Sequence, residues 1–484
     1  MKIITPEQFG AVADGITNDL YAVSLALAEA MAGDCTVEFA ADKTYYLGYD
    51  GRVEALAAFA LHDCKNVTLR GCRTRILIDR PLYYTEIVRT ENTVLEGFIF
   101  DYRVRPFALG TVLERDDEAL TAVVQADRSL QIDRETDTEF AVLQRDDGRY
   151  HLFLRGVEPL EEENRYRLHF RDVADTRRFL KMTDTYPVIL PLPGFAHRIE
   201  RAFSVTDNTD FTMRHCRVWS MARFGFAILR NYGTLLFDDL RVEKAPGEPC
   251  KIVGWRDCFH VKENHAKCLW YRCYAEYCYD DIFNISASTL HVQEVLSETE
   301  LDFRWRETGG TYPCVEKGDT FSIVDTETGR DYGTAVVREV VRQEGGHNVI
   351  RFCTPFRGVP AGESIFAFDL DNVAPGSIIE ECDFRGTFRF RGPIEIRHSD
   401  FYVARMWIDV YERLEGPVPR DVCFRDCTLT CDDEENPYFH IVAQRKSVQT
   451  EQPYHLENIV FEHCRLPVKT LEIDPLDKPY VRLP

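Results

Sequence analysis

The sequence predicts an all-β protein: a right-handed parallel β-helix (solenoid) with an N-terminal capping helix and two inserted small antiparallel β-barrel modules. Three observations predict this fold: a strand-turn-strand unit that repeats, an amphipathic helix near the start, and two regions of hairpin pattern that interrupt the repeat. A short strand-turn-strand unit cannot bury its own apolar face. Such units are stable only when they stack, which makes their repetition typical of a solenoid.

The repeating unit is clearest where alternating apolar and polar residues lead into a turn that carries cysteine. Six copies show it: "NVTLRGC", "DFTMRHCRVW", "CLWYRCYAEY", "SIIEECDFRG", "VCFRDCTLTC" and "NIVFEHCRLP". Two more, "TLLFDDLRVE" around Asp239 and "PIEIRHSDFY" around Ser399, have another residue in the cysteine place. Equivalent positions of successive coils stack, so we expect most of the 16 cysteines to be buried, reduced thiols.

The predicted helix follows a short strand at the start of the chain. The segment "FGAVADGITNDLYAVSLALAEAM" has an Asp-Gly turn, and Thr17 or Asn18 is the candidate N-cap. Apolar residues then recur at helical spacing, at Leu20, Val23, Leu27 and Met31. A solenoid has an open end whose core must be covered, and a helix over 17–32 covers it.

The two interruptions divide the chain into five segments. Residues 1–107 form the N-terminal cap and first coils, 108–195 a small β-barrel module, and 196–295 the central coils. Residues 296–370 form a second small β-barrel module, and 371–484 the last coils. Both modules show short strands joined by Asp-Gly, Thr-Gly or Gly-Gly turns, the pattern of antiparallel hairpins.

Charge limits the partners of the protein. The formal net charge of −22 repels phosphate backbones and anionic lipid surfaces, so nucleic acid and membranes are not expected partners. The start "MKIITPEQFGAVADG" lacks the apolar core of a secretory signal, and no stretch is long and apolar enough to span a membrane. We therefore expect a cytoplasmic protein, whose substrate is a neutral sugar more readily than a polyanion. The oligomeric state does not follow from the sequence.

Three carboxylates are the strongest candidates for chemistry. Asp280 follows Asp257 by 23 residues, about one coil, and Asp281 follows directly. Neighbouring strands of a parallel sheet lie about 4.8 Å apart, so this spacing brings the three acids to one face. Glycoside hydrolysis requires one protonated carboxyl to donate to the leaving oxygen and an ionised one to activate water or attack carbon. Asp257, Asp280 and Asp281 are thus the predicted catalytic residues.

Several nearby polar and aromatic residues are candidate substrate contacts. Aromatic rings stack on sugar faces, while amides, guanidinium groups and acids bind hydroxyls. His260 shares the face of Asp257 only if the chain bends between them, and Glu276 aligns with Asp280 if the strand continues. The full set of predicted substrate-binding residues is His260, Asn284, Glu276, Arg223, Asn231 and Trp255.

A zinc site is the alternative interpretation of the cysteines and histidines between 256 and 278. Its residues would be Cys258, His260, His265, Cys268, Cys273 and Cys278. No C-x-x-C pair and no H-E-x-x-H motif is present there, so the spacing does not favour zinc. We expect the catalytic site to use no metal and no other cofactor.

Longer stretches resemble known families. The opening resembles the "FGA-x-x-DG-x-x-D" start of pectate-lyase-like right-handed β-helix proteins. "FDYRVRPFALGTV", "GFAILRNYGTLLFDDLRVEKAPG", "RDCFHVKENHAKCLWYRC" and "CYDDIFNIS" resemble, in order, signatures of glycoside hydrolase family 110. This resemblance implies an enzyme that removes terminal α-1,3-linked galactose from an oligosaccharide or glycoconjugate, with inversion and without metal. It places the acidic trio of that family on Asp257, Asp280 and Asp281.

The division of roles comes from a more distant resemblance. In polygalacturonase-like β-helix hydrolases the first acid of the Asp-Asp pair donates the proton, which implies Asp280 as the acid and Asp257 and Asp281 as bases. The sequence departs from family 110 after the pair. Where the family usually reads Asn-Val-His-Gly, this chain reads "NISAS", so Asn284 is kept and the histidine is absent. The resemblance therefore supports the catalytic class better than it supports the galactose specificity.

Two other functions use the same fold. A polysaccharide lyase needs a basic residue, such as Arg256 or Lys262, and usually calcium. A non-catalytic carbohydrate-binding β-helix keeps the aromatic residues but needs no acidic trio. Hydrolysis that does not depend on calcium and gives no unsaturated product distinguishes the hydrolase from both alternatives.

Overall fold

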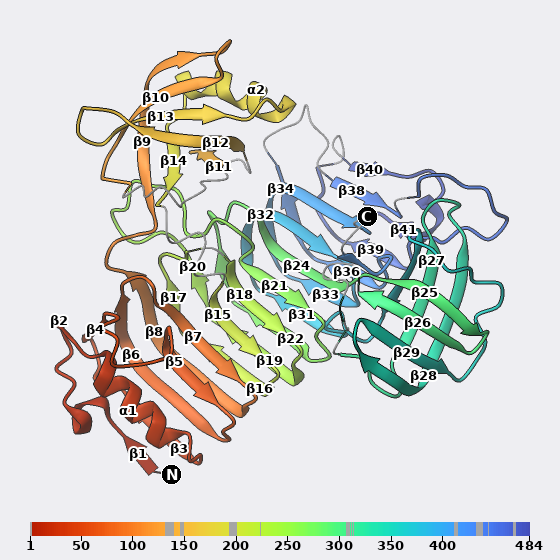
Figure 1. Cartoon of the computed structure of the whole chain (residues 1–484), viewed down its shortest axis with the longest axis horizontal. Helices are drawn as coiled ribbons and strands as arrows, with labels where there is room; N and C mark the ends of the chain where they lie inside the picture. The colour runs from red at the N-terminus through yellow and green to blue at the C-terminus, as the bar shows by residue number, and fades with distance from the viewer. Residues whose placement is uncertain are drawn as a thin grey trace.

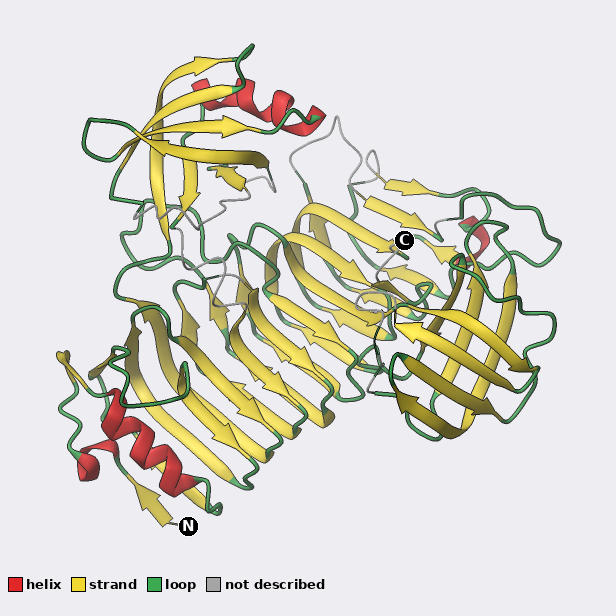
Figure 2. Ribbon diagram, viewed as in Figure 1, coloured by secondary structure: helices red, strands yellow, loops and turns green. Residues whose placement is uncertain are grey.

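The computed structural model is a right-handed parallel β-helix that carries two β-barrels (Figures 1 and 2). It describes residues 2–130, 140–145, 150–192, 201–222, 224–305, 310, 312, 314–410, 415–431, 439–443, 445–467 and 471–484. Twenty-nine described strands pair in the solenoid and twelve form the barrels. The pairings separate the solenoid into three parallel sheets that the chain visits in turn. The predicted fold class is confirmed.

The first sheet holds the cysteine-turn repeat. Its strands, in stacking order, are β1 (Lys2–Ile4), β3 (Cys35–Glu38), the first half of β6 (Val67–Ile78), the first half of β8 (Glu91–Tyr102), β16 (Thr209–Arg214), β19 (Tyr232–Asp238), β22 (Lys267–Tyr271), β31 (Ser377–Glu380), β33 (Ile394–Arg397), β36 (Val422–Arg425), β39 (Ile459–Glu462) and β41 (Val481–Arg482).

The second sheet follows the turn. It contains β2 (Asp14–Asn18), β4 (Thr44–Leu47), the second halves of β6 and β8, β17 (Arg217–Val218), β20 (Arg241–Val242), β23 (Tyr274–Ala275), the first half of β32 (Asp383–Phe390), the first half of β34 (Asp400–Asp409) and β37 (Thr428–Thr430). The long strands bend from one sheet to the next without a break.

The third sheet carries the residues of functional interest. It contains β5 (Ala57–His62), β7 (Tyr83–Val88), β15 (Arg201–Thr206), β18 (Phe224–Leu229), β21 (Phe259–Lys262), β24 (Asp281–Ser288), the second halves of β32 and β34, β38 (Phe439–Val442) and β40 (Leu471–Ile473). The short β35 (Glu415–Gly416) pairs antiparallel with the end of β24.

The turn after the first sheet explains the cysteine repeat. The residue before the cysteine place has a left-handed backbone, with φ between 47° and 56° at His215, Asp239, Arg272, Glu381, His398, Asp426 and His463. The next side chain points inward, and twelve of the sixteen cysteines are buried thiols, as predicted. In the copy read around Asp239, it is Leu240 that takes the cysteine place, because Asp239 supplies the left-handed residue.

Aromatic rings fill the core beneath the third sheet. Phe203, Phe226, Phe259 and Phe283 stack along the axis, with ring centroids 4.4 to 5.0 Å apart. Each ring comes from an equivalent position of its coil, since these residues are register partners. Side chains alternate along a strand, so the residues that follow these rings point to the outside of the sheet.

A helix caps the N-terminal end of the solenoid, as predicted (Figure 1). Helix α1 (Leu20–Ala30) follows the short 3₁₀ helix η1 (Pro6–Phe9) and buries Leu20, Val23 and Leu27 against the first coils. The N-cap residue is Asp19, and Asn18 instead accepts a hydrogen bond from the amide of Leu20. Asp19 binds the preceding turn through the amides of residues 12 and 13, which places it at the helix start. Among the described residues no helix has the length and apolarity to cross a membrane.

Each insertion is a closed six-stranded barrel (Figure 2). The first contains β9 (Phe107–Asp116), β10 (Thr121–Ala126), β11 (Phe140–Leu143), β12 (His151–Pro159), β13 (Arg165–Phe170) and β14 (Val188–Pro191), with helices α2 (Ala174–Leu180) and η2 (Lys181–Asp184). The second contains β25 (Leu290–Ser297), β26 (Glu300–Trp305), β27 (Thr320–Asp325), β28 (Asp331–Glu344), β29 (His347–Phe352) and β30 (Ile365–Asp369). The helix η4 (Lys478–Tyr480) lies near the C-terminus.

The second barrel begins earlier than the sequence pattern indicated. We placed its start at residue 296, whereas its first strand, β25, begins at Leu290. Only Thr289 separates β24 of the solenoid from β25 of the barrel, so the polar turn that marks a boundary is missing there. The apolar alternation therefore runs through the boundary without a break.

Candidate active site

The three aspartates lie together at the edge where the chain enters the third sheet. Asp281 begins β24, and Asp257 precedes β21 by two residues. Continuing the β21–β24 register backwards places these two opposite each other, and the amide of Cys258 donates a hydrogen bond to the Asp281 carbonyl at 2.7 Å. One carboxylate oxygen from each of Asp257, Asp280 and Asp281 lies within 4.8 Å of the others. The structure thus brings the trio together, while the chemical roles stay a prediction.

An irregular strand allows the adjacent Asp280 and Asp281 to reach one site. Neighbours in a regular strand point to opposite faces. Here Asp280 lies in a bend before the strand, and the register between β24 and β32 shifts after Asp281. Gly386 on β32, at φ +148°, makes room for this bend. A Cβ at Gly386 would lie 2.8 Å from Cγ1 of Ile282, so glycine is required for the close approach.

Each acid of the trio contacts a basic side chain. The contacts are Arg256 Nη1 to Asp280 Oδ2 at 2.9 Å, Arg389 Nε to Asp281 Oδ2 at 2.8 Å, and His260 Nδ1 with Asp257 Oδ2 at 2.7 Å. An arginine within hydrogen-bonding distance favours the ionised form of a carboxylate. Burial lowers the pKa of Arg389, but the surrounding acids, with Asp281 foremost, together outweigh it and raise that pKa above its usual range. Arg389 is therefore a permanent cation at the site.

Aromatic rings from two parts of the protein surround Arg256. Its guanidinium carbon lies 5.8 Å from the ring centroid of Phe140 and 5.9 Å from that of Phe224. Phe140 belongs to β11 of the first barrel and Phe224 to β18 of the solenoid. The ring of Phe224 also lies 5.2 Å from that of His260. The first barrel therefore supplies part of the wall of the site.

A row of outward-facing residues extends from the trio across the third sheet. Its members are register partners on successive strands: Ala227, His260, Asn284, Arg389, Trp407 and His440. They face outward because the residues before them, five phenylalanines and Met406, face the core. The guanidinium of Arg389 lies 4.0 Å from the ring centroid of Trp407, which fixes its orientation. This row is a polar and aromatic surface beside the acids.

A buried charge network adjoins the row. Glu415 contacts Asn284 Nδ2 at 3.0 Å, Lys262 Nζ at 3.3 Å and Arg391 Nη1 at 3.5 Å. Burial raises the pKa of Glu415, but Lys262 and Arg391 outweigh it and hold that pKa well below its usual range. Arg391 is fully buried and also contacts Asp409 at 3.4 Å. Asn284 thus lies beside His260 and is oriented by Glu415, while its predicted contact with substrate stays a prediction.

The structure does not bring Asn231 to the site. Asn231 follows the end of β18, at the opposite edge of the third sheet from the trio, and is fully buried. Its Oδ1 accepts from the amide of Asn208 and its Nδ2 donates to the carbonyl of Val205, both at 2.9 Å. Asn264 continues the same stack on the next coil. The predicted substrate contact is instead an internal asparagine ladder that satisfies the backbone of the turns.

Two other candidates also lie elsewhere. Glu276 follows β23 in the second sheet, where it contacts Tyr274 and faces the charge of Arg385; burial raises its pKa. The chain bends before β24, so Glu276 does not align with Asp280 as predicted. Trp255 is 3% exposed and packs against Tyr279 and the barrel residue Phe140, so it anchors the barrel instead of presenting a face to sugar. Arg223 lies outside the described residues.

Sequence reasoning missed four charged residues around the acids. They are Arg389, Arg391, Asp409 and Glu415. Arg389 is 108 residues from Asp281, and Glu415 is 131 residues from Asn284. The whole second barrel lies between them in the sequence, so coil spacing cannot be counted across it. The only signal that could have placed β24 next to β32 is the repeat, which stops before the insertion and resumes after it.

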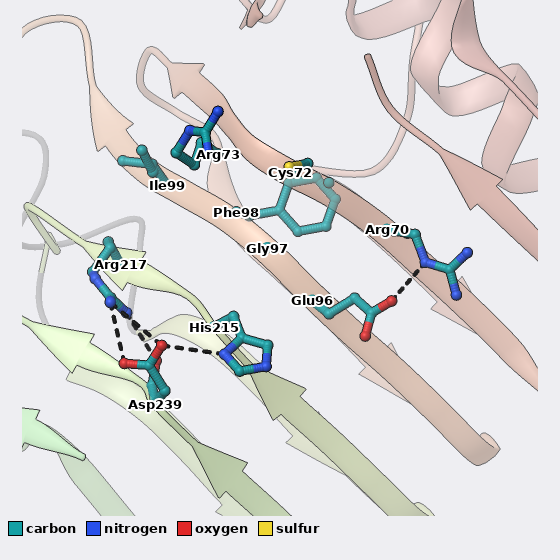
Figure 3. A pocket seen from close by; sticks show the side chains of 11 residues that line it. Arg70, Cys72, Arg73, Glu96, Gly97, Phe98, Ile99, His215, Arg217 and Asp239 are labelled. Atoms are coloured by element: carbon teal, nitrogen blue, oxygen red, sulfur yellow. Dashed lines mark hydrogen bonds and ion pairs between the residues drawn. The ribbon is translucent and has the colours of Figure 1, made fainter. Parts of the chain in front are cut away.

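A separate groove of about 610 Å³ lies on the first coils (Figure 3). Its lining includes Arg70, Glu96, His215, Arg217 and Asp239, and none of the trio. Figure 3 shows its charged side chains bonded to one another: Arg70 with Glu96, and His215 and Arg217 with Asp239. Mutually paired charges leave few groups to bind a ligand. We therefore place the candidate active site at the trio.

Comparison with known proteins finds only distant structural similarity. No known family profile matches the chain, and no curated protein matches it. The family 28 exopolygalacturonase of Yersinia enterocolitica is similar over 100% of this chain and 68% of its own, at 11% identity and a TM-score of 0.40. The Streptococcus pneumoniae surface protein and adhesin PfbA matches over 99% and 89%, at 10% identity and 0.36. The Azotobacter vinelandii mannuronan C-5 epimerase AlgE4 A-module matches over 99% of both chains, at 9% and 0.33. Similarities this distant assign neither a family nor an activity to the chain.

Proposed function

We propose that this protein is an exo-acting glycoside hydrolase that removes a terminal α-linked sugar, with galactose in α-1,3 linkage as the first substrate to test. The observation that carries the proposal is the contact of Asp257, Asp280 and Asp281, each bonded to a basic side chain. Glycosidic cleavage needs a proton donor and an ionised carboxylate, and this cluster offers both. The sugar and the linkage rest on the resemblance to glycoside hydrolase family 110.

The ion pairs favour a different division of roles from the one the sequence suggested. Arg256 and Arg389 favour ionised Asp280 and Asp281, which suits these two to hold the attacking water. Asp257 contacts His260 at 2.7 Å and has no arginine partner among the residues in the structure's described ranges. The imidazole of His260 fixes the orientation of the Asp257 carboxyl through this contact. We therefore assign Asp257 as the proton donor, oriented by His260, in place of Asp280.

The stereochemical outcome is a separate question. Inverting glycosidases usually hold acid and base roughly 6.5–9.5 Å apart, and retaining ones roughly 5 Å apart. The nearest oxygens of the trio lie within 4.8 Å of one another, whereas the family resemblance predicts inversion. We retain inversion in the proposal because two arginine-bonded carboxylates hold one water between them. A single-carboxylate nucleophile, as retention requires, would leave the third acid without a role.

A cation-dependent lyase is the second candidate, since three carboxylates within 4.8 Å also match a metal site. Two arginines oppose it. Arg256 and Arg389 already neutralise two of the three charges, so the trio needs no metal ion to be stable. The positive charges of Arg256 and Arg389 would also repel a cation bound at the trio. The non-catalytic alternative gives no reason for burying three acids beside one another, an arrangement that costs stability unless it serves chemistry.

A panel of aryl α- and β-glycosides, assayed with and without chelator, tests the proposal. We expect release of the aryl group from an α-glycoside, α-galactoside first, at a rate unchanged by chelator. Proton NMR of the first sugar product then gives the stereochemistry, and β-anomer from an α-glycoside establishes inversion. An unsaturated uronate product, or activity lost with chelator and restored by calcium, would favour the lyase. No turnover of any glycoside, with sugar binding retained, would favour the binding protein.

A further inference from the structure

A second cluster of metal-binding side chains lies where the second barrel meets the solenoid. His265, Asp319 and Asp369 each place one nitrogen or oxygen within 4.8 Å of the others. His265 lies in the turn between β21 and β22, Asp319 immediately precedes β27, and Asp369 is the last residue of β30. One ligand group therefore comes from the solenoid and two from the barrel.

The charge balance of this cluster differs from that of the catalytic trio. Asp319 and Asp369 are 6% and 1% exposed, so both carboxylates are withdrawn from water. Within the described part of the chain neither forms an ion pair with lysine or arginine, and the only basic contact is His265 Nε2 to Asp319 Oδ1 at 3.2 Å. Buried carboxylates this close are stabilised either by a shared proton or by a compensating positive charge. A bound cation would supply that charge.

A buried amide beside the two acids adds a candidate ligand. Asn372 is fully buried and its Nδ2 donates to Asp369 Oδ2 at 2.7 Å. Among the described residues its Oδ1 has no hydrogen-bond partner. A carbonyl oxygen in a buried polar environment is costly without a partner, and it is a regular ligand of divalent cations. The unpartnered oxygen of Asn372, on the amide that contacts Asp369, is a second observation that points to a ligand.

The side chains are held in place by their neighbours. Backbone amides donate to both acids, Glu316 to Asp319 Oδ2 at 2.6 Å and Asp371 to Asp369 Oδ1 at 3.0 Å. The ring of Tyr232 stacks on the His265 imidazole at 5.3 Å between centroids, with the planes 10° apart. Such contacts fix the orientation of ligands before a metal binds.

We propose that His265, Asp319 and Asp369 bind a divalent first-row transition-metal ion that joins the second barrel to the solenoid. One imidazole with carboxylate ligands suits Zn²⁺ or Mn²⁺, whereas Ca²⁺ prefers oxygen ligands alone. The ion is structural in this proposal and takes no part in the chemistry at the trio. Its existence therefore does not depend on the proposed hydrolysis.

Titration of the chelator-treated full-length protein with Mn²⁺, followed by electron paramagnetic resonance of the free ion, tests the site. Mn²⁺ is the first probe because the many thiols of this chain do not compete for it as they do for Zn²⁺. We expect one Mn²⁺ per chain and a rise in melting temperature on binding. Asp369→Asn and His265→Gln should each weaken binding at least about tenfold.

His347→Gln is the matched control. His347 also pairs with a barrel aspartate, Asp302, at 2.6 Å. Among the described residues, this pair has no second carboxylate close enough to form a metal site with it. This variant should bind Mn²⁺ like the parent. Circular dichroism and the metal-free melting temperature show whether each variant is folded. A parent that binds neither Mn²⁺ nor Zn²⁺, or an Asp369→Asn protein that binds as tightly as the parent, would overturn the proposal. If the parent and His265→Gln bound Ca²⁺ equally well, His265 would not be a ligand of the site.

Discussion

Arg389 donates a hydrogen bond from Nε to Oδ2 of Asp281 at 2.8 Å, although 108 residues separate the two in the sequence. The contact exists because β32 pairs with β24 directly, while the whole second barrel lies between them along the chain. The guanidinium of Arg389 also lies over the ring of Trp407, one strand further along the sheet. The pairing of two coils across an insertion thus places a cation beside the acidic trio.

Replacing Arg389 by lysine tests this contact. Lysine keeps the charge but loses the planar donor group and its stacking on Trp407. We expect kcat to fall roughly 10- to 100-fold because Asp281 is no longer held in place, with KM changed less. Arg385→Lys, on the same strand but paired with Asp383, is the control and should behave like the parent. A kcat at the parent level in Arg389→Lys would show that the contact is not needed.

Glu415 should stabilise the protein in a pH-dependent way. Its pKa is lowered in the folded state, so its contribution is fully present above the unfolded pKa of about 4.3 and is lost as pH falls below it. Glu415→Gln removes the carboxylate charge that contacts Lys262 and Arg391, which should cost about 3 kcal/mol of unfolding free energy at pH 7. Denaturant unfolding at pH 7 and pH 3 measures both values. A difference between parent and variant that stays constant or grows toward pH 3 would contradict this account.

Asn231 is expected to matter for stability and not for catalysis. Asn231→Ala removes two buried hydrogen bonds to backbone groups, which should cost about 2–4 kcal/mol. The folded fraction should keep the parent kcat and KM, because the residue lies at the far edge of the third sheet. Asn92→Ala, at an exposed position near the start of β8 with an amide contact to the side chain of Asn66, should cost less than about 1 kcal/mol. A raised KM in stable, folded Asn231→Ala protein would restore the substrate-binding interpretation.

Most thiols should be unreactive in the native protein. Burial raises the pKa of Cys64 to about 11 and those of Cys216 and Cys268 to about 12. A thiol-specific reagent at pH 8 should therefore label chiefly Cys72 and Cys353, the two exposed cysteines, and most of the sixteen only after denaturation without reductant. Mass spectrometry counts the labels. Rapid native labelling of Cys216 would show that the turn ladder is open to solvent.

The fold could be predicted because its rules are local. A left-handed residue before an inward side chain, most often cysteine, recurs along the solenoid, and the apolar spacing of Leu20, Val23 and Leu27 marks the cap. The boundary at Leu290 was missed because one strand pattern continues into the next. The helix start was predicted at Thr17 or Asn18, whereas the N-cap is Asp19. The side chain of Asp19 binds the preceding turn, which the sequence pattern did not reveal.

The candidate site was predictable only where one coil contains it. Asp257, Asp280 and His260 lie within one repeat length, so counting residues brought them together. Arg389 and Glu415 come from beyond the second barrel, and Phe140 from the first, where no period can be counted. Asn231 was misassigned because a polar residue beside a strand reads the same from sequence whether it faces solvent or satisfies a buried turn.

The turnover of Asp257→Asn, Asp280→Asn and Asp281→Asn tests the central claim most directly. Asparagine keeps the shape of each side chain and removes the ionisable group, so kcat on an unactivated disaccharide should fall by roughly two to four orders of magnitude in each variant. Asp257→Asn should recover most on an aryl glycoside with a good leaving group, which needs little protonation. Asp280→Asn and Asp281→Asn should stay impaired on both substrates. Greatest recovery in Asp280→Asn would return the proton donor to that residue, and near-normal turnover in all three folded variants would contradict a catalytic trio.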